Sequence, residues 1–169
     1  MGLPDGWYGN GFPATNYQSM EKLKTGQIDS FDALVDESQY QTRYHGWTDV
    51  VNTLKKIIEK ESADETRPEG SVVNFIDLKV AEHSDHTYTG IAVEEALNKS
   101  QYRQAKFYDY AIKEKEPNVS GEDLVWKIGM YLFYNQTAFE MPNGQDHLES
   151  DYFKWLFRQY QTNSGSVAK

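Results

Sequence analysis

Residues 71–80 read SVVNFIDLKV, and this stretch decides the fold class. It holds β-branched and apolar residues over about the length of one strand, with too little polar alternation for a strand that has one solvated face. The pattern therefore predicts a buried strand. The segment HSDHTYTGIAV, residues 83–93, predicts a second strand that returns across a turn at Ser84 and Asp85. Together they predict a small β-sheet or hairpin over about residues 71–93.

Helical patterns lie before and after this predicted sheet in the sequence. The clearest begins at Thr48, a good N-cap, with Asp49 in the first turn. Its apolar residues recur at helical spacing, at Val50, Leu54 and Ile58. Four more helical regions are predicted at about residues 15–24, 31–44, 94–116 and 146–160. The chain as a whole therefore predicts a helix-rich α+β protein.

One further segment has two interpretations. Residues 124–134 read LVWKIGMYLFY and are apolar nearly all round. Such a segment is typical of a buried helix or of a core strand. Ser120 stands where it would cap the helix.

The length of the chain favours one domain, because 169 residues match the usual size of a single hydrophobic core. We expect a single domain over residues 1–169. Within it, the glycine- and aromatic-rich N-terminal segment, residues 1–14, is predicted to be irregular backbone. The tail, residues 163–169, is predicted to be frayed.

The composition excludes several classes of function. Lys and Arg number 17 against 26 Asp and Glu, and the resulting net charge of -9 argues against a general binder of nucleic acid or of anionic membranes. The absence of cysteine excludes disulfides, thiolate zinc sites, iron–sulfur clusters and cysteine nucleophiles. Residues 1–14 lack the basic start and apolar run of a signal peptide, and no stretch predicts a membrane helix. We therefore expect a cytoplasmic protein without a membrane partner.

His83 and His86 stand three residues apart, between Glu82 and Asp85. Histidines at this spacing can share a metal ion when they lie on a helix. Because this segment is predicted as a turn between strands, a solvated surface turn is favoured over a metal site.

A carboxylate and an ammonium group, Asp77 and Lys79, lie two residues apart on the predicted strand, so their side chains share one face. Such a pair can hold a divalent cation and stabilise charge on an attacked phosphate. The sequence FIDLK resembles the central motif of the PD-(D/E)xK nucleases. Some subfamilies add a GxxD element upstream and a QxxxY helix downstream, and Gly46–Asp49 and Gln104–Tyr108 match them in that order.

This resemblance implies a nuclease that depends on Mg or Mn. Asp77 and Asp49 would be its metal ligands, Lys79 would act in catalysis, and Gln104 and Tyr108 would position the substrate. The competing interpretation is that Asp77 and Lys79 form an ordinary ion pair on a strand face and that Gln104 is a helix surface residue. Nucleic acid is a partner only under the nuclease interpretation.

Aromatic residues give the remaining signal. Trp7, Tyr8 and Phe12, beside glycines, and Trp155, off the main stripe of the last predicted helix, are predicted binding residues. Tyrosine and tryptophan are enriched at binding hot spots. The alternative is that the N-terminal rings pack under the domain as a clasp.

Two function hypotheses follow. The first is a small acidic protein-interaction module without a cofactor, regulatory or inhibitory toward a basic or nucleic-acid-binding partner, with self-association as another explanation for exposed aromatic residues. The second is the metal-dependent nuclease.

Overall fold

The computed structural model describes residues 1, 3–4, 6, 9–33, 43–62, 71–97, 102–140 and 151–162. The chain divides into two compact units. Unit 1 comprises Met1–Asp109 and Thr162–Lys169, and unit 2 comprises Tyr110–Gln161. The single domain predicted over residues 1–169 stays a prediction, and the predicted tail lies outside the described residues.

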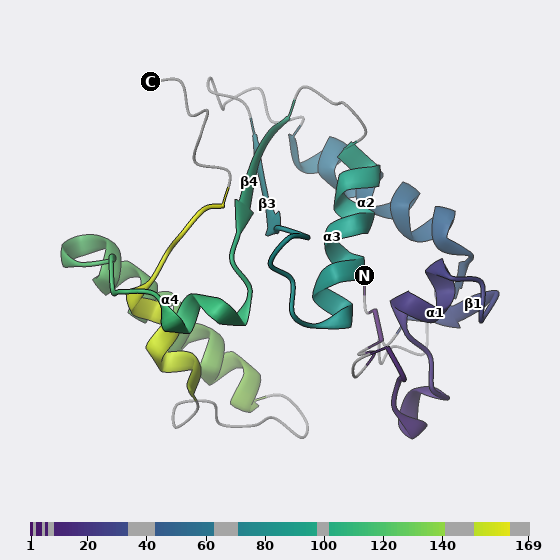
Figure 1. The fold of residues 1–169 in the computed structure, drawn as a ribbon, viewed down its shortest axis with the longest axis horizontal. Coiled ribbons are helices and arrows are strands. Elements are labelled where there is room, and N and C mark those ends of the chain that lie inside the picture. Colours follow the sequence, from purple (N-terminus) through teal and green to yellow (C-terminus); the bar gives the residue numbers. More distant parts are fainter. Residues whose placement is uncertain are drawn as a thin grey trace. The chain divides into compact units, whose positions relative to one another are not determined.

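Unit 1 carries the strands and most of the helices (Figure 1). In chain order its elements are the 3₁₀ helix η1 (Pro13–Thr15), α1 (Met20–Lys24), β1 (Ser30–Asp32), β2 (Arg43–His45), α2 (Trp47–Ser62), β3 (Val72–Ile76), α3 (Ser84–Leu97) and β4 (Arg103–Phe107). Those of unit 2 are η2 (Tyr110–Glu114), α4 (Gly121–Glu140) and η3 (Asp151–Phe157). This combination of helices with small sheets confirms the predicted helix-rich α+β class.

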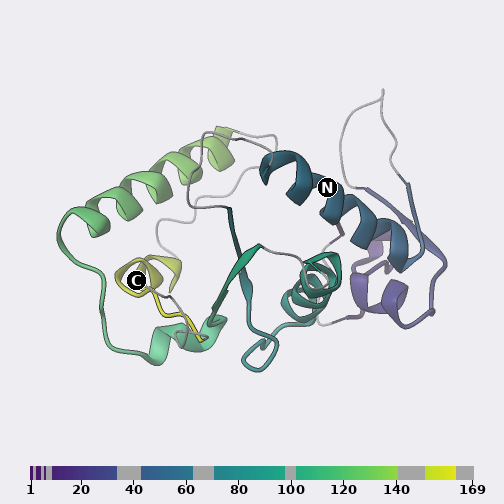
Figure 2. The ribbon, with the colours of Figure 1, turned by 90° about the horizontal axis from the view of Figure 1, so that it is seen from above.

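A strand predicted within residues 71–80 is present as β3, but its predicted burial is wrong, because Phe75 alone of its five residues is buried and Val72 and Asn74 are exposed. Its partner is also not the segment that follows. β3 pairs in parallel with β4, and Ile76 lies opposite Phe107 at the end of the ladder. Parallel strands need a crossover connection, which α3 supplies (Figures 1 and 2). The return strand of the predicted hairpin over residues 71–93 is therefore wrong, because Ser84–Leu97 is helical.

Close packing explains why this segment becomes a helix. Gly90 approaches the end of β3 so closely that a Cβ there would lie 2.6 Å from Cδ2 of Leu78. On the same helix Ala92, Ala96 and Leu97 are buried. Small side chains let the helix approach its neighbours closely, and this tertiary fit outweighs the strand propensity of its threonine and valine residues.

The helices predicted over residues 94–116 are only partly present. α3 continues to Leu97 and η2 covers Tyr110–Glu114, but β4 lies between them. The sequence RQAKF of β4 has a helical preference of its own. Its pairing with β3 and the burial of Ala105 outweigh that preference.

A second sheet lies where a helix is predicted at residues 31–44. β1 pairs antiparallel with β2, with Phe31 opposite Tyr44 and their ring centroids 5.4 Å apart. Both side chains are buried, and their cross-strand contact stabilises the pair. The helix is therefore wrong at both ends of the segment, while residues 34–42 lie outside the described residues.

Two predicted helices are present, but both begin elsewhere than predicted. α2 begins at Trp47, so Thr48 lies within it and is not its N-cap, and α1 covers only Met20–Lys24 of the predicted residues 15–24. The carboxylate of Asp49 in the first turn of α2 accepts a hydrogen bond from the amide of His45 at 2.8 Å. The hydroxyl of Ser19 accepts one from the amide of Lys22 at 3.1 Å and so caps α1. Ser19 thus satisfies a backbone N–H group in the first turn of α1, while Asp49 connects the first turn of α2 to His45 of β2.

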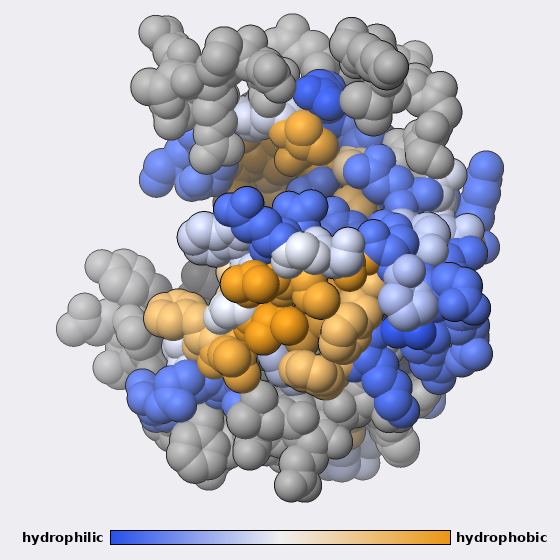
Figure 3. Space-filling model, turned by 90° about the vertical axis from the view of Figure 1, so that its left-hand side faces the viewer, coloured by the Kyte–Doolittle hydropathy of each residue, from blue (hydrophilic) through white to orange (hydrophobic). Residues whose placement is uncertain are grey.

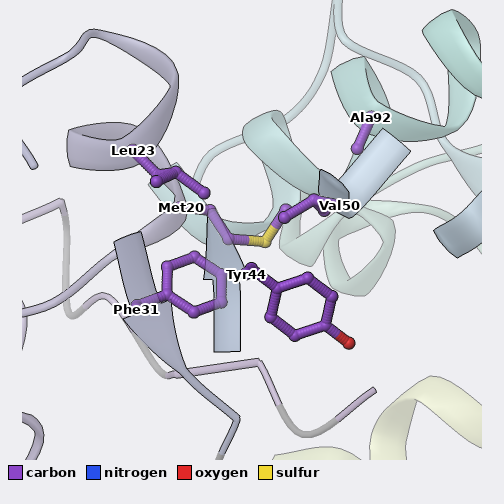
Figure 4. Packing of buried hydrophobic residues seen from close by; sticks show 6 residues of the cluster. All are labelled: Met20, Leu23, Phe31, Tyr44, Val50 and Ala92. Atoms are coloured by element: carbon purple, nitrogen blue, oxygen red, sulfur yellow. The ribbon is translucent and has the colours of Figure 1, made fainter. Parts of the chain in front are cut away.

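Two clusters of buried side chains stabilise unit 1. The first joins α1, β1, β2, α2 and α3 (Figure 4) and consists of Met20, Leu23, Phe31, Tyr44, Val50 and Ala92. The second joins α3 and β3 and consists of Phe75, Val93 and Leu97. Leu54 of α2 packs against both clusters, so α2 connects them.

In unit 2, residues 124–134 belong to the helix α4, but the predicted burial is wrong because most of its apolar side chains are exposed. Of the last predicted helix, residues 146–160, the structure describes the part from residue 151 onward, where η3 is a 3₁₀ helix. Among the described residues, no helix combines the length and the apolar character needed to cross a membrane.

Candidate functional site

Asp77 lies directly after β3, where it is 8% exposed. Its Oδ2 accepts a hydrogen bond from the hydroxyl of Thr162 at 2.5 Å, and its Oδ1 accepts one from the amide of Lys79 at 3.1 Å. The hydrogen bond from Thr162 is the main cause that lowers the pKa of Asp77, against the opposing effect of burial. Both carboxylate oxygens thus hold the turn after β3 and connect it to residue 162.

Three of the five residues of the predicted nuclease pattern, Asp77, Lys79 and Tyr108, follow the strands at one end of the β3–β4 sheet. The amide of Asp77 donates to the carbonyl of Phe107 at 3.0 Å, so Asp77 and Tyr108 both follow the carboxyl ends of paired parallel strands. This edge is where open parallel sheets commonly bind ligands. Lys79 is exposed in the turn that follows Asp77.

The other two residues of the pattern lie elsewhere. Asp49 is on α2, where its carboxylate is bound to the amide of His45. Gln104 is exposed on β4, so the QxxxY segment begins on a strand and not on the helix that the resemblance implies. Within the described ranges, no three His, Cys, Asp or Glu side chains are grouped so that they could hold a metal ion. The structure therefore does not assemble the implied site from these residues.

His83 and His86 lie at the N-terminal end of α3, so the predicted turn between strands is wrong. Nδ1 of His86 lies 2.7 Å from Oδ1 of Asp109, which is 5% exposed and also accepts a hydrogen bond from the amide of Glu82. A buried carboxylate that holds one ring nitrogen orients the imidazole, as in general bases and in metal–histidine sites. Sequence reasoning missed this pair because 23 positions separate its members.

The aromatic residues predicted to bind a partner have different positions. Trp7 and Tyr8 lie outside the described residues. Phe12 is 36% exposed beside η1. Trp155 is half-buried, and its ring lies 5.4 Å from that of Tyr110 within unit 2. This packing accounts for much of the surface that the sequence analysis expected to be exposed.

α4 carries an exposed apolar surface that sequence reasoning missed. Six large side chains are between 46% and 76% exposed, and Figure 3 shows apolar side chains gathered on the face that carries α4. We call this surface the α4 stripe; it consists of Val125, Trp126, Met130, Leu132, Phe133 and Tyr134. The signal was present in the sequence, because a helix that is apolar nearly all round has more apolar surface than one side of contact covers.

The opposite side of α4 provides its contacts inside unit 2. Leu124, Ile128 and Tyr131 are half-buried, and the ring of Tyr131 lies 6.4 Å from that of Phe153 in η3. The ammonium group of Lys127 donates to the carbonyl of Arg158 at 2.6 Å, and burial lowers the pKa of Lys127. These contacts show which side of α4 packs against the rest of unit 2 and which side carries the stripe.

An open pocket of about 620 Å³ lies beside the N-terminal half of the stripe. Val119, Trp126 and Met130 give it apolar walls, and its polar and charged lining residues are Asn118, Ser120, Asp123, Lys127 and Gln159. All of these residues belong to unit 2. The pocket therefore extends the stripe into a concave surface whose lining includes the carboxylate of Asp123 and the side chain of Lys127.

Comparison with protein-family models, with curated proteins and with solved structures gives no match.

Proposed function

We propose that this protein is a protein-interaction module and that the α4 stripe is its contact surface. The observation that carries the proposal is the exposure of large apolar side chains on one helix, with Trp126 at 66% and Phe133 at 76%. Large contiguous apolar patches are uncommon on monomeric soluble proteins, and they often mark interaction sites. Covering this surface removes apolar area from water, which favours association.

The composition of the stripe supports the same conclusion. Trp126, Phe133 and Tyr134 are of the aromatic types that are enriched at interfaces, and Met130 adds a flexible apolar side chain. The pocket beside Trp126 offers a place for one anchoring side chain of a partner. A regulatory or inhibitory role belongs to this proposal, because a bound module covers a surface of its partner.

The nuclease hypothesis has weaker support. Both carboxylate oxygens of Asp77 accept hydrogen bonds within the protein, and the carboxylate of Asp49 accepts one from the amide of His45. A metal ion at Asp77 would have to compete with the hydroxyl of Thr162. The nuclease therefore stays the second hypothesis, which the Asp77 variants below distinguish from the first.

Site-specific photo-cross-linking tests the proposal. With a benzoylphenylalanine at position 133, irradiation in an extract of the source cells is expected to give a discrete adduct, which mass spectrometry identifies. The purified partner should then bind wild type, and Trp126→Ala should weaken that binding by at least about 30-fold, as for a hot-spot residue.

The matched control lies on α2, where Ile57 is 41% exposed. The photo-reactive residue at position 57 is expected to give no corresponding adduct, and Ile57→Ala should bind the purified partner like wild type. Equal adducts at the two positions, or tight binding by Trp126→Ala, would contradict the proposal.

A further inference from the structure

The two ends of the α4 stripe carry the same charge. At 100° per residue, Glu122, Trp126, Phe133 and Glu140 fall within one narrow arc of α4, with a glutamate before and after the two rings. The two glutamates stand about 27 Å apart along the helix at 1.5 Å per residue. The stripe is therefore an apolar track that is closed by a carboxylate at each end.

The helix itself makes these ends unequal. Glu122 and Asp123 lie in the first turn, where the positive end of the helix dipole offsets their charge. Glu140 stands at the last position, where no basic residue lies in the last turn and the dipole adds to the negative potential. The one lysine of α4, Lys127, points its ammonium group to the carbonyl of Arg158 inside unit 2.

We propose that the α4 stripe binds an amphipathic helix of another protein whose apolar side is flanked by lysine or arginine, with its more basic end at Glu140. This rests on the proposed function and adds the chemistry of the partner. A second copy of the chain fits poorly, because the stripes would place glutamate against glutamate in parallel or antiparallel pairing. The net charge of -9 also makes two copies repel and attracts a cationic partner.

The pocket supports the same partner chemistry. Asp123, Trp126 and Met130 line it together with Lys127, whose ammonium group is bound to the carbonyl of Arg158. A lysine or arginine side chain can place its methylene groups on these apolar walls and its charge near the carboxylate or over the indole ring.

The test uses two synthetic helical peptides of about 20 residues, which match the length of the stripe. They share one leucine-rich side, and they carry lysine or glutamate at the flanking positions; a scrambled lysine peptide is the control. In calorimetric titration at about 50 mM salt, the lysine peptide should bind at least about tenfold more tightly than the glutamate peptide, and this preference should shrink at about 500 mM salt.

Variants connect the binding to the stripe. Trp126→Ala should weaken the lysine peptide by at least about 30-fold. Glu140→Lys should weaken it by about 2- to 5-fold, the size expected for an exposed charge pair. Glu61→Lys, at an exposed position of α2, makes the same change in net charge and should leave the affinity unchanged.

The outcomes separate this inference from the proposed function. If both peptides bind equally and Trp126→Ala weakens both, the stripe is a docking surface and the basic partner is wrong. If Trp126→Ala leaves the affinity for both peptides unchanged, the proposed function is wrong as well. A dimer in sedimentation that Trp126→Ala dissolves, or co-flotation of the protein with phosphatidylcholine vesicles, would overturn the basic helix in favour of a second copy or of a lipid surface.

Discussion

The helices α2 and α4 use similar apolar residues in opposite ways. Val50 of α2 is fully buried, and Leu54 packs against both clusters of unit 1. Among the described side chains of α4, the one that is buried is the polar Asn135, while Phe133 is 76% exposed. In α2 the apolar residues keep to one side of the helix. In α4 the apolar residues continue around the helix, beyond the side that contacts the rest of unit 2.

This difference separates residues that stabilise the fold from residues that are available for a partner. An apolar side chain contributes to folding only if folding removes it from water. Substitutions in α2 and its clusters should therefore change the free energy of unfolding, and substitutions in the α4 stripe should change binding.

The largest effect is expected where a buried ring is removed. Phe31→Ala leaves a cavity among the side chains of the first cluster and should lower the free energy of unfolding by about 3–5 kcal/mol, measured by urea denaturation. Phe133→Ala removes a ring of the same kind from an exposed position and should change the free energy of unfolding by less than about 0.5 kcal/mol. A similar loss in both variants would mean that the stripe is covered within the folded protein.

The next effect concerns the carboxylate of Asp77. Its pKa is lower in the folded state than the value of about 3.9 in an unfolded chain, so its stabilisation is complete above that value and is lost as the pH falls through the folded pKa. Asp77→Asn should therefore cost about 1–3 kcal/mol at pH 7, and in urea titrations at several pH values the cost should begin to shrink below about pH 4 and disappear once the pH is below the folded-state pKa.

Thr162→Val is the matched variant, because it removes the partner of the carboxylate and leaves the carboxylate itself. Thr162→Val should raise the pKa of Asp77 and reduce the change in the free energy of unfolding between neutral and acidic pH. An Asp77→Asn protein that keeps its full stability but loses Mg-dependent cleavage of DNA would reverse this conclusion and support the nuclease.

A smaller effect compares two helical glycines. Gly90→Val forces a side chain against Leu78 and the carbonyl of Ile76 and should cost about 1–3 kcal/mol. At Gly129 of α4 a Cβ meets nothing within 4 Å, so Gly129→Ala should raise the stability of unit 2 by about 0.5–1 kcal/mol through helix propensity. Thermal unfolding followed by circular dichroism measures both. A destabilising Gly129→Ala would show that α4 packs closely there.

The smallest effect is expected on the exposed side of α2. The ammonium group of Lys55 lies 3.9 Å from the carboxylate of Glu59, and both side chains are more than half exposed. Lys55→Ala should change the free energy of unfolding by less than about 0.5 kcal/mol, and about 0.5 M salt should remove the difference. A larger loss would show that the polar side of α2 also contributes to folding.

Local patterns predicted the fold where one segment determines its own structure. The spacing of Val50, Leu54 and Ile58 predicted α2, and the apolar run predicted β3. The local patterns failed where contact with a distant segment of the chain determines the secondary structure. β4 forms because β3 lies beside it, and the segment from Ser84 becomes a helix because parallel strands need a crossover.

The candidate sites were harder to predict, for two physical reasons. The contact between His86 and Asp109 depends on the pairing of β3 with β4, which no local sequence pattern predicts. The α4 stripe was recognised as apolar but was assigned to the core, because periodicity alone does not tell which sides of a helix find a partner within the chain. The position of Trp126 on the uncovered side became visible only with the contacts of Lys127 and Tyr131.

The hydrogen bonds of Thr162 have a consequence for the order of assembly during synthesis. The backbone of Thr162 donates to the carbonyl of Lys106, and its hydroxyl donates to Asp77, so unit 1 is completed by a residue that the ribosome adds after all of unit 2. Until then the carboxyl edge of the sheet lacks its last partner, while α4 and its stripe have already been translated. Folding of unit 1 is therefore completed only after all of unit 2 has been synthesised, although unit 1 begins the chain.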